Sequence, residues 1–123
     1  MIHITNLGLI SFLLFIFHLP LSAQDGDEPD IQACITCEEL KNLALPELVI
    51  TEAVTIKTTT TYCKVLGTIG KEINFELLLP GEWNGRFFMG GGGGFVGSIA
   101  NGVGRRVHNG YATSGTDTGH KGH

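Results

Sequence analysis

The chain has 123 residues and a formal net charge of -4. The length is that of one small domain. The negative net charge excludes the basic surface that nucleic-acid binding requires. Acidic and basic residues are interspersed after Asp30, so charge patterning names no charged partner. Sixteen of the 18 glycines lie from Gly67 onward, which predicts backbone there that other residues cannot adopt, or that another group approaches closely.

Residues 1–23 are predicted to be a cleaved signal peptide. Leu7–Leu21 is apolar, lacks acidic residues, lysine and arginine, and is short for a membrane span of about 20 residues. Small residues at Ser22 and Ala23 suit a cleavage site, and an acidic linker follows over 24–35. The alternatives are a membrane anchor and a buried helix. We expect a secreted or periplasmic protein with no stable membrane insertion after cleavage.

Export determines how the three cysteines are interpreted. In an oxidising compartment a disulfide is the default, and the residues alone favour a bridge to Cys63 from either Cys37 or Cys34, with one thiol left over. Cys34 and Cys37 also match CxxC, the spacing of redox and zinc sites. Neither a second ligand pair nor a thioredoxin-like context accompanies them, so no metal site is predicted.

The first half of the mature chain predicts one short helix and several strands. Thr36 and Glu39 have capping-box spacing at the start of a helix over 36–43, which Pro46 ends. Val, Ile and Thr enrichment predicts a strand over 48–57, continuing as the threonine tract 58–61. Alternating character predicts a second strand over 62–69, and a third is expected over 73–79, ended by Pro80.

The second half predicts strands that alternate with loops and one weak helix. The expected elements are a turn at 82–85, a strand at 86–89, the glycine run 90–94, a helix at 98–108, a strand at 110–114 and a loop at 115–122. Gly102 and Gly104 weaken the helix.

This order is typical of the beginning of an α/β sheet. The last strand has no helix after it to cover it, although parallel strands need cover on both faces. We therefore expect an incomplete α/β sheet over 36–123, in a truncated chain that does not bury a full core by itself.

The glycine run has three interpretations. The first is an oxyanion-hole loop, in which backbone N–H groups stabilise the negative oxygen formed during acyl transfer. The second is a dinucleotide site, because Gly92, Gly94 and Gly97 satisfy GxGxxG and Asp117 follows about 20 residues later. Five consecutive glycines match that pattern easily by chance, and several predicted strands precede the run. We therefore reject the dinucleotide site. The third is a flexible loop without chemistry.

Several ordered stretches between Cys37 and His120 resemble the tannase and feruloyl esterase family. The family's opening pattern is matched by Cys37-Glu38-Glu39-Leu40 through Leu45-Pro46 and Ile50-Thr51-Glu52-Ala53. Its next strands resemble Tyr62-Cys63-Lys64-Val65-Leu66-Gly67-Thr68-Ile69, Ile73-Asn74-Phe75-Glu76-Leu77-Leu78-Leu79-Pro80 and Trp83-Asn84-Gly85-Arg86-Phe87. Its later motifs resemble Gly93-Gly94-Phe95-Val96-Gly97-Ser98-Ile99, Gly110-Tyr111-Ala112 and Ser114-Gly115-Thr116-Asp117-Thr118-Gly119-His120.

The resemblance implies an exported serine esterase with an α/β-hydrolase core and an inserted lid domain. Its substrates would be small esters of aromatic acids, such as galloyl or feruloyl esters, and related members accept a terephthalate monoester. It implies a disulfide between Cys37 and Cys63. It also implies that Gly93 supplies the first oxyanion N–H, with Gly92 and Gly94 as register alternatives.

This chain departs from the family in three respects. The family usually has Asn where Gly92 stands, and Cys34 has no counterpart. The nucleophile, acid and base of the catalytic triad, and the calcium site of the lid, are all expected beyond residue 123. We therefore expect no nucleophile, metal or cofactor within this chain.

Single polar residues are given structural roles. His120 lies too early to be the base of an α/β-hydrolase, so Asp117 and His120 are interpreted as organising their loop, with Asp117 accepting from backbone N–H groups. Ser98 and Ser114 lack the G-x-S-x-G elbow. Trp83 is interpreted as an anchor for its turn, and Arg86 as an ion-pair partner of Glu76.

Two function classes remain. The first is a carboxylic ester hydrolase of the EC 3.1.1 type, to which this chain contributes the oxyanion loop but not the triad. The alternative is a non-catalytic exported β-rich module that binds a partner or glycan, or an inactive remnant of an esterase. The presence of a G-x-S-x-G-like elbow in the complete gene product would discriminate between them.

Overall fold

The structure, a computed structural model, describes residues 32–92 and 97–120. The predicted signal peptide, most of the predicted linker, Gly93 and Gly94 therefore lie outside the described residues. Within the described ranges, no helix is long and apolar enough to cross a membrane. The elements are η1 (Glu38–Asn42), β1 (Leu48–Lys57), β2 (Thr61–Ile69), β3 (Ile73–Pro80), β4 (Phe87–Met89), η2 (Gly104–Asn109) and β5 (Ala112–Thr116).

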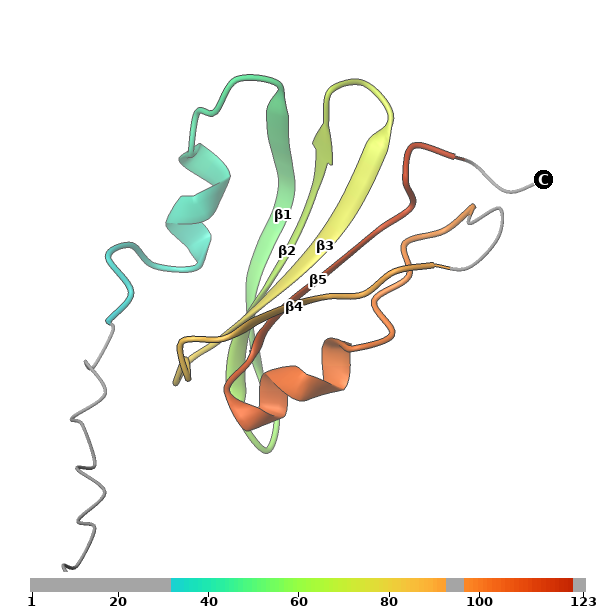
Figure 1. Cartoon of the computed structure of the whole chain (residues 1–123). Helices are drawn as coiled ribbons and strands as arrows, with labels where there is room; N and C mark the ends of the chain where they lie inside the picture. The colour runs from blue at the N-terminus through green and yellow to red at the C-terminus, as the bar shows by residue number, and fades with distance from the viewer. Residues whose placement is uncertain (1–31, 93–96, 121–123) are drawn as a thin grey trace, which may run out of the picture.

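The strands form one mixed sheet with the order β1-β2-β3-β5-β4 (Figure 1). β1, β2 and β3 are joined by hairpins and pair antiparallel. β5 pairs antiparallel with β3 and parallel with β4. Because β4 and β5 are parallel neighbours, the segments that follow them both leave the sheet at the carboxyl ends of these two strands.

One face of the sheet carries the main apolar core. Ala53, Val65 and Phe75 are buried there, and Leu40 of η1 packs against them. A disulfide between Cys37 and Cys63 joins η1 to β2, with 5.6 Å between the two Cα atoms. This is the pairing that the family resemblance implied. Cys34 is exposed and its thiol is free.

The opposite face is covered by η2, which lies against β3 and β5. Val107 is the buried residue of this helix, and the His108 ring meets Tyr62 of β2 edge-on. Near the free edge of the sheet the Arg106 guanidinium lies over the Phe88 ring, 4.7 Å from its centroid. The sheet therefore has a short helix on each face, as an α/β architecture requires.

The apolar core face is uncovered where it reaches β4. Leu77 of the core pairs with Ser114, and Ser114 pairs with Met89, so the Met89 side chain points to the same face as the core. Met89 is nevertheless 61% exposed and Phe87 is 54% exposed. Together they form an apolar strip at the edge of the sheet.

Both predicted helices are shorter in the structure. The capping box is present, since the Thr36 N–H donates to the Glu39 carboxylate at 2.7 Å, but only the single 3-10 helix η1 follows instead of a helix over 36–43. The helix predicted over 98–108 is wrong in its first half. Gly102 and Gly104 weaken helix there, and Ala100 forms an antiparallel bridge with Thr116 instead.

Strand boundaries also differ from the predictions. The tract 58–61 was expected to continue the first strand, but the Thr58 N–H donates to the Thr60 carbonyl and turns the chain. The last strand lies at 112–116 rather than 110–114, because Gly110 adopts a left-handed conformation that ends η2. Gly115 and Thr116, expected in a loop, therefore lie in a strand.

The exposed apolar residues Phe87 and Met89 of β4 generate a prediction for the isolated chain. We expect purified residues 24–123 to unfold in urea without a cooperative transition, because too little apolar surface is buried to offset the loss of chain entropy. Circular dichroism and tryptophan fluorescence across a urea series would measure it, with Trp83 as the probe. A sharp transition that coincides in both signals would contradict the prediction.

Candidate active site

The carboxyl ends of β4 and β5 form the candidate active site. Phe87 pairs with Ala112 and Met89 with Ser114, so the carboxyl ends of the two strands lie side by side. The glycine run follows β4, and the loop from Asp117 to His120 follows β5. In Figure 1 the ribbon after β5 (red) and the ribbon on either side of the glycine run (orange) lie on the same side of the sheet. In open α/β sheets ligands bind outside the carboxyl ends of the strands.

Both ends of the segment from Gly90 to Ala100, here called the glycine segment, are attached to β5. The Gly90 N–H donates to the Ser114 carbonyl at 2.6 Å, and the Ala100 N–H donates to the Thr116 carbonyl at 3.4 Å. Gly90 is buried, whereas Gly91 and Gly92 are exposed. Gly92 is thus the one predicted oxyanion donor within the described residues, and it lies two residues after the anchored Gly90.

Gly115 of β5 lies where the returning end of the glycine segment crosses the strand. A Cβ atom built on Gly115 would overlap the carbonyl oxygen and carbon of Ala100. These are backbone atoms and cannot rotate away as the end of a side chain could. The absence of a side chain at this position therefore permits the glycine segment to approach β5.

Asp117 organises the loop after β5, as the sequence predicted. Its buried carboxylate accepts from the backbone N–H of Asn74 at 2.9 Å, from Asn74 Nδ2 at 2.6 Å and from the Gly119 N–H at 3.0 Å. The Asn74 side chain is the main cause that holds the pKa of Asp117 below its ordinary value, and the backbone N–H groups add to it, whereas burial acts in the opposite direction. The carboxylate is thus committed to holding the loop on β3.

The serines within the described residues are not arranged as nucleophiles. Ser114 donates its hydroxyl to the Glu76 carbonyl at 2.9 Å, and Ser98 is exposed. His120 is exposed in the loop after β5, where its backbone N–H donates to the Asp117 carbonyl. Across 32–92 and 97–120, no group of three or more His, Cys, Asp or Glu side chains could hold a metal ion.

Trp83 and Arg86 have different outcomes. The Trp83 indole N–H donates to the Arg86 carbonyl at 2.9 Å, so Trp83 anchors its turn as predicted. The predicted ion pair between Arg86 and Glu76 is wrong, because the Glu76 carboxylate accepts from Asn101 instead. Arg86 directly precedes β4, and its carbonyl also accepts from the Ala112 N–H.

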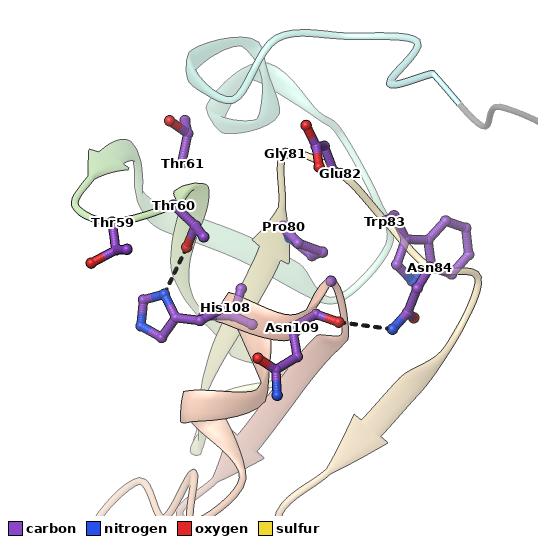
Figure 2. A pocket seen from close by; sticks show the side chains of 12 residues that line it. Thr59, Thr60, Thr61, Pro80, Gly81, Glu82, Trp83, Asn84, His108 and Asn109 are labelled. Atoms are coloured by element: carbon purple, nitrogen blue, oxygen red, sulfur yellow. Dashed lines mark hydrogen bonds between the residues drawn. The ribbon is translucent and has the colours of Figure 1, made fainter.

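A pocket that sequence reasoning did not find lies at the amino ends of β4 and β5. It is an open pocket of about 860 Å³, and Figure 2 shows its lining side chains. Thr60 Oγ1 and His108 Nδ1 lie 2.7 Å apart across it. The lining residues are Thr59, Thr60, Thr61, Pro80, Gly81, Glu82, Trp83, Asn84, Val107, His108, Asn109 and Gly110.

This pocket lacks the arrangement that acyl transfer needs. Asn84 uses its side-chain amide on the Asn109 carbonyl, and Trp83 uses its N–H within the turn. The Thr60–His108 pair resembles a nucleophile with its base, but no carboxylate orients the ring among the described residues of the pocket. No sequence motif marks this pocket, because the hairpin, the turn and η2 that line it are brought together by the tertiary fold.

Comparison with known proteins identifies the family. A family model described as tannase and feruloyl esterase matches residues 56–123. The chain belongs to the tannase and feruloyl esterase family. Over 76 residues it is 40% identical to a mono(2-hydroxyethyl) terephthalate hydrolase of Piscinibacter sakaiensis and 36% identical to an uncharacterized esterase of Agrobacterium fabrum. These matches span 48% and 49% of the chain but only 13% and 14% of the relatives' lengths.

Two solved structures from Aspergillus oryzae establish the fold of this family member. One is an esterase with 22% identity and the other is feruloyl esterase B with 24% identity, and each has a TM-score of 0.59. Each comparison covers 70% of this chain and 22% of the solved chain. The mixed sheet thus matches part of an α/β-hydrolase esterase, which confirms the predicted fold class.

The contact at Gly115 predicts a selective effect of one methyl group. In the complete gene product, we expect Gly115→Ala to cost about 1–3 kcal/mol of unfolding free energy, because Ala100 must move away from β5. Gly102→Ala is the matched control, since a Cβ there meets no atom within 4 Å. Thermal unfolding measures both variants, and equal shifts of their melting temperatures would contradict the predicted contact.

The lowered pKa of Asp117 predicts how stability depends on pH. Because its folded pKa lies below the ordinary value of 3.8, its contribution is complete above the unfolded pKa and is lost as pH falls through the folded pKa. We expect Asp117→Asn to lower the melting temperature of the complete protein at pH 7. The gap to the unchanged protein should narrow below about pH 4. A difference in melting temperature between the two proteins that stays constant from about pH 7 to pH 3 would refute this role for the carboxylate.

Proposed function

We propose that this chain is the N-terminal portion of an exported serine esterase that cleaves esters of aromatic acids, and that it supplies oxyanion-hole donors from its glycine segment. The observation that carries the proposal is the attachment of both ends of that segment to β5, at the carboxyl edge of a parallel strand pair. Gly93 is the proposed donor, with Gly92 and Gly94 as register alternatives.

The chemistry explains why anchored glycines suit this role. When a nucleophile attacks an ester carbonyl, negative charge develops on the carbonyl oxygen. A backbone N–H aimed at that oxygen contributes about 3 kcal/mol to transition-state stabilisation, provided that it is already in position. Glycines let the substrate approach the backbone closely, and hydrogen bonds at both ends reduce the reorganisation needed during the reaction. The nucleophile, acid and base of the proposal belong to the rest of the protein.

The names of similar proteins support the substrate class. A mono(2-hydroxyethyl) terephthalate hydrolase and a feruloyl esterase both act, by those names, on esters of aromatic carboxylic acids. We therefore propose an ester of a benzoic or cinnamic type of acid as the substrate. The disulfide between Cys37 and Cys63 supports export, because such bonds persist in oxidising compartments. Residues 1–23 are the proposed signal peptide.

The proposal is tested with the complete gene product. We expect it to hydrolyse p-nitrophenyl acetate and methyl ferulate or methyl gallate. Replacing Gly93 with Pro or Val should reduce kcat about 100-fold or more while leaving circular dichroism unchanged, because a proline lacks the N–H and a valine side chain restricts the backbone. The same replacements at Gly92 and Gly94 would determine the register.

Gly70→Ala provides the comparison, because Gly70 has a positive φ, like many loop glycines, but lies in the distant hairpin between β2 and β3. The Gly70→Ala variant should be less stable than the unchanged protein, while its kcat stays within about twofold of the original value. A folded complete protein that cleaves none of these esters would reject the esterase proposal. It would favour the alternative of a non-catalytic binding module.

A further inference from the structure

The returning end of the glycine segment is held by a side chain as well as by the backbone. Asn101 directly follows Ala100, and its Nδ2 donates to Glu76 Oε1 at 3.0 Å and to Thr113 Oγ1 at 3.4 Å. Glu76 lies on β3 and Thr113 on β5. One amide group thus joins the returning chain to two strands of the sheet.

The chemistry of the partners fixes the orientation of this amide. An ionised carboxylate is only an acceptor, so Glu76 requires the NH2 group of Asn101 to face it. Thr113 is completely buried, and its hydroxyl accepts from the same NH2 group. The opposite atom, Asn101 Oδ1, is buried and has no hydrogen-bond partner among the described residues. The donor end of Asn101 therefore makes the attachment.

The backbone around Asn101 is packed closely enough to transmit its position. A Cβ on Gly90 would lie 3.1 Å from the Gly102 nitrogen and 3.3 Å from the Asn101 Cα, and a Cβ on Gly104 would lie 3.3 Å from the Asn101 side chain. The departing end at Gly90 thus touches the returning end at Asn101. A displacement of Asn101 is therefore expected to disturb the packing at both ends of the glycine segment.

We propose that Asn101, held by Glu76, is a positioning residue that fixes both ends of the glycine segment for ester hydrolysis. The inference rests on the proposed function, because its effect on catalysis follows only if this segment supplies oxyanion donors. Asn101 touches no reacting atom in the proposal. It acts by keeping the backbone donors at the distance that the transition state requires, and a misplacement of about 1 Å can cost about 100-fold in rate.

The decisive variant exchanges donor and acceptor. Asn101→Asp keeps the size of the side chain but places a carboxylate against that of Glu76, so the contact is lost. Adding Glu76→Gln restores it with the roles reversed, since the glutamine amide on β3 then donates to the new carboxylate on the returning chain. In the complete gene product we expect Asn101→Asp to lower kcat about 10- to 100-fold with KM within about threefold, and the double variant to recover most of kcat.

Two further variants control the experiment. Asn101→Ala removes the attachment without adding charge, and we expect it to lower kcat by the same factor. It replaces Asn101→Asp as the test if the aspartate variant does not fold. Asn109→Asp makes the identical chemical change on an exposed side chain at the far end of η2, and kcat should stay unchanged. A loss of kcat in the Asn109 variant equal to that in Asn101→Asp would overturn the proposal, because the effect would then be one of charge.

Hydrogen–deuterium exchange separates the attachment from the chemistry. Without substrate, the amides of Gly90 and Ala100 should exchange at least about 10-fold faster in Asn101→Asp and return toward the original rate in the double variant. Unchanged exchange, or faster exchange with unchanged kcat, would overturn the positioning role. Faster exchange with recovery in the double variant, in a protein that cleaves no ester even unmutated, would reject the proposed function while supporting the attachment.

Discussion

The pairing of β5 with two different neighbours is the constraint on which the candidate site depends. Its antiparallel hydrogen bonds to β3 join it to the hairpin sheet and the disulfide-linked core. Its parallel hydrogen bonds to β4 bring the start of the glycine segment to the edge where β5 itself ends. Ser114 and Thr116 also accept from the two ends of that segment, so β5 provides the backbone contacts at both ends of the proposed oxyanion loop.

Composition along β5 follows from these contacts. Ala112, Thr113 and Gly115 are buried, and at Gly115 the crossing backbone of Ala100 leaves no room for a side chain. Asp117, the first residue beyond the strand, uses its carboxylate on Asn74 and Gly119. The strand therefore stabilises little by apolar burial of its own. Its value to the fold lies in hydrogen bonds to both neighbours, which a larger side chain at Gly115 would disturb.

The sequence could predict the local elements better than their connections. Val, Ile and Thr residues predicted β1, alternating character predicted β2, and β3 was expected as the run that Pro80 ends. The spacing of Thr36 and Glu39 predicted the cap of η1. The role of Asp117 in its loop was also predicted, since an aspartate side chain can accept from nearby backbone N–H groups of a turn. The helix expected over 98–108 failed because the competing interaction was tertiary: Ala100 bridges to Thr116, and Asn101 reaches Glu76. Gly102 and Gly104 weakened this helix locally, but no local signal identified the distant strands that Ala100 and Asn101 contact instead.

The same limitation applies to the residues around the candidate site. The family resemblance directed attention to Gly93, yet the side chains that hold the segment are Asn101, Glu76 and Thr113, which no motif joins. Glu76 was assigned to Arg86 as an ion-pair partner, but its half-buried carboxylate accepts from the neutral side-chain amide of Asn101 instead. An amide also holds a backbone in one orientation, because its two ends differ in donor character. An ion pair on a flexible arginine would allow more freedom, so the observed partner is the one better suited to holding a loop still.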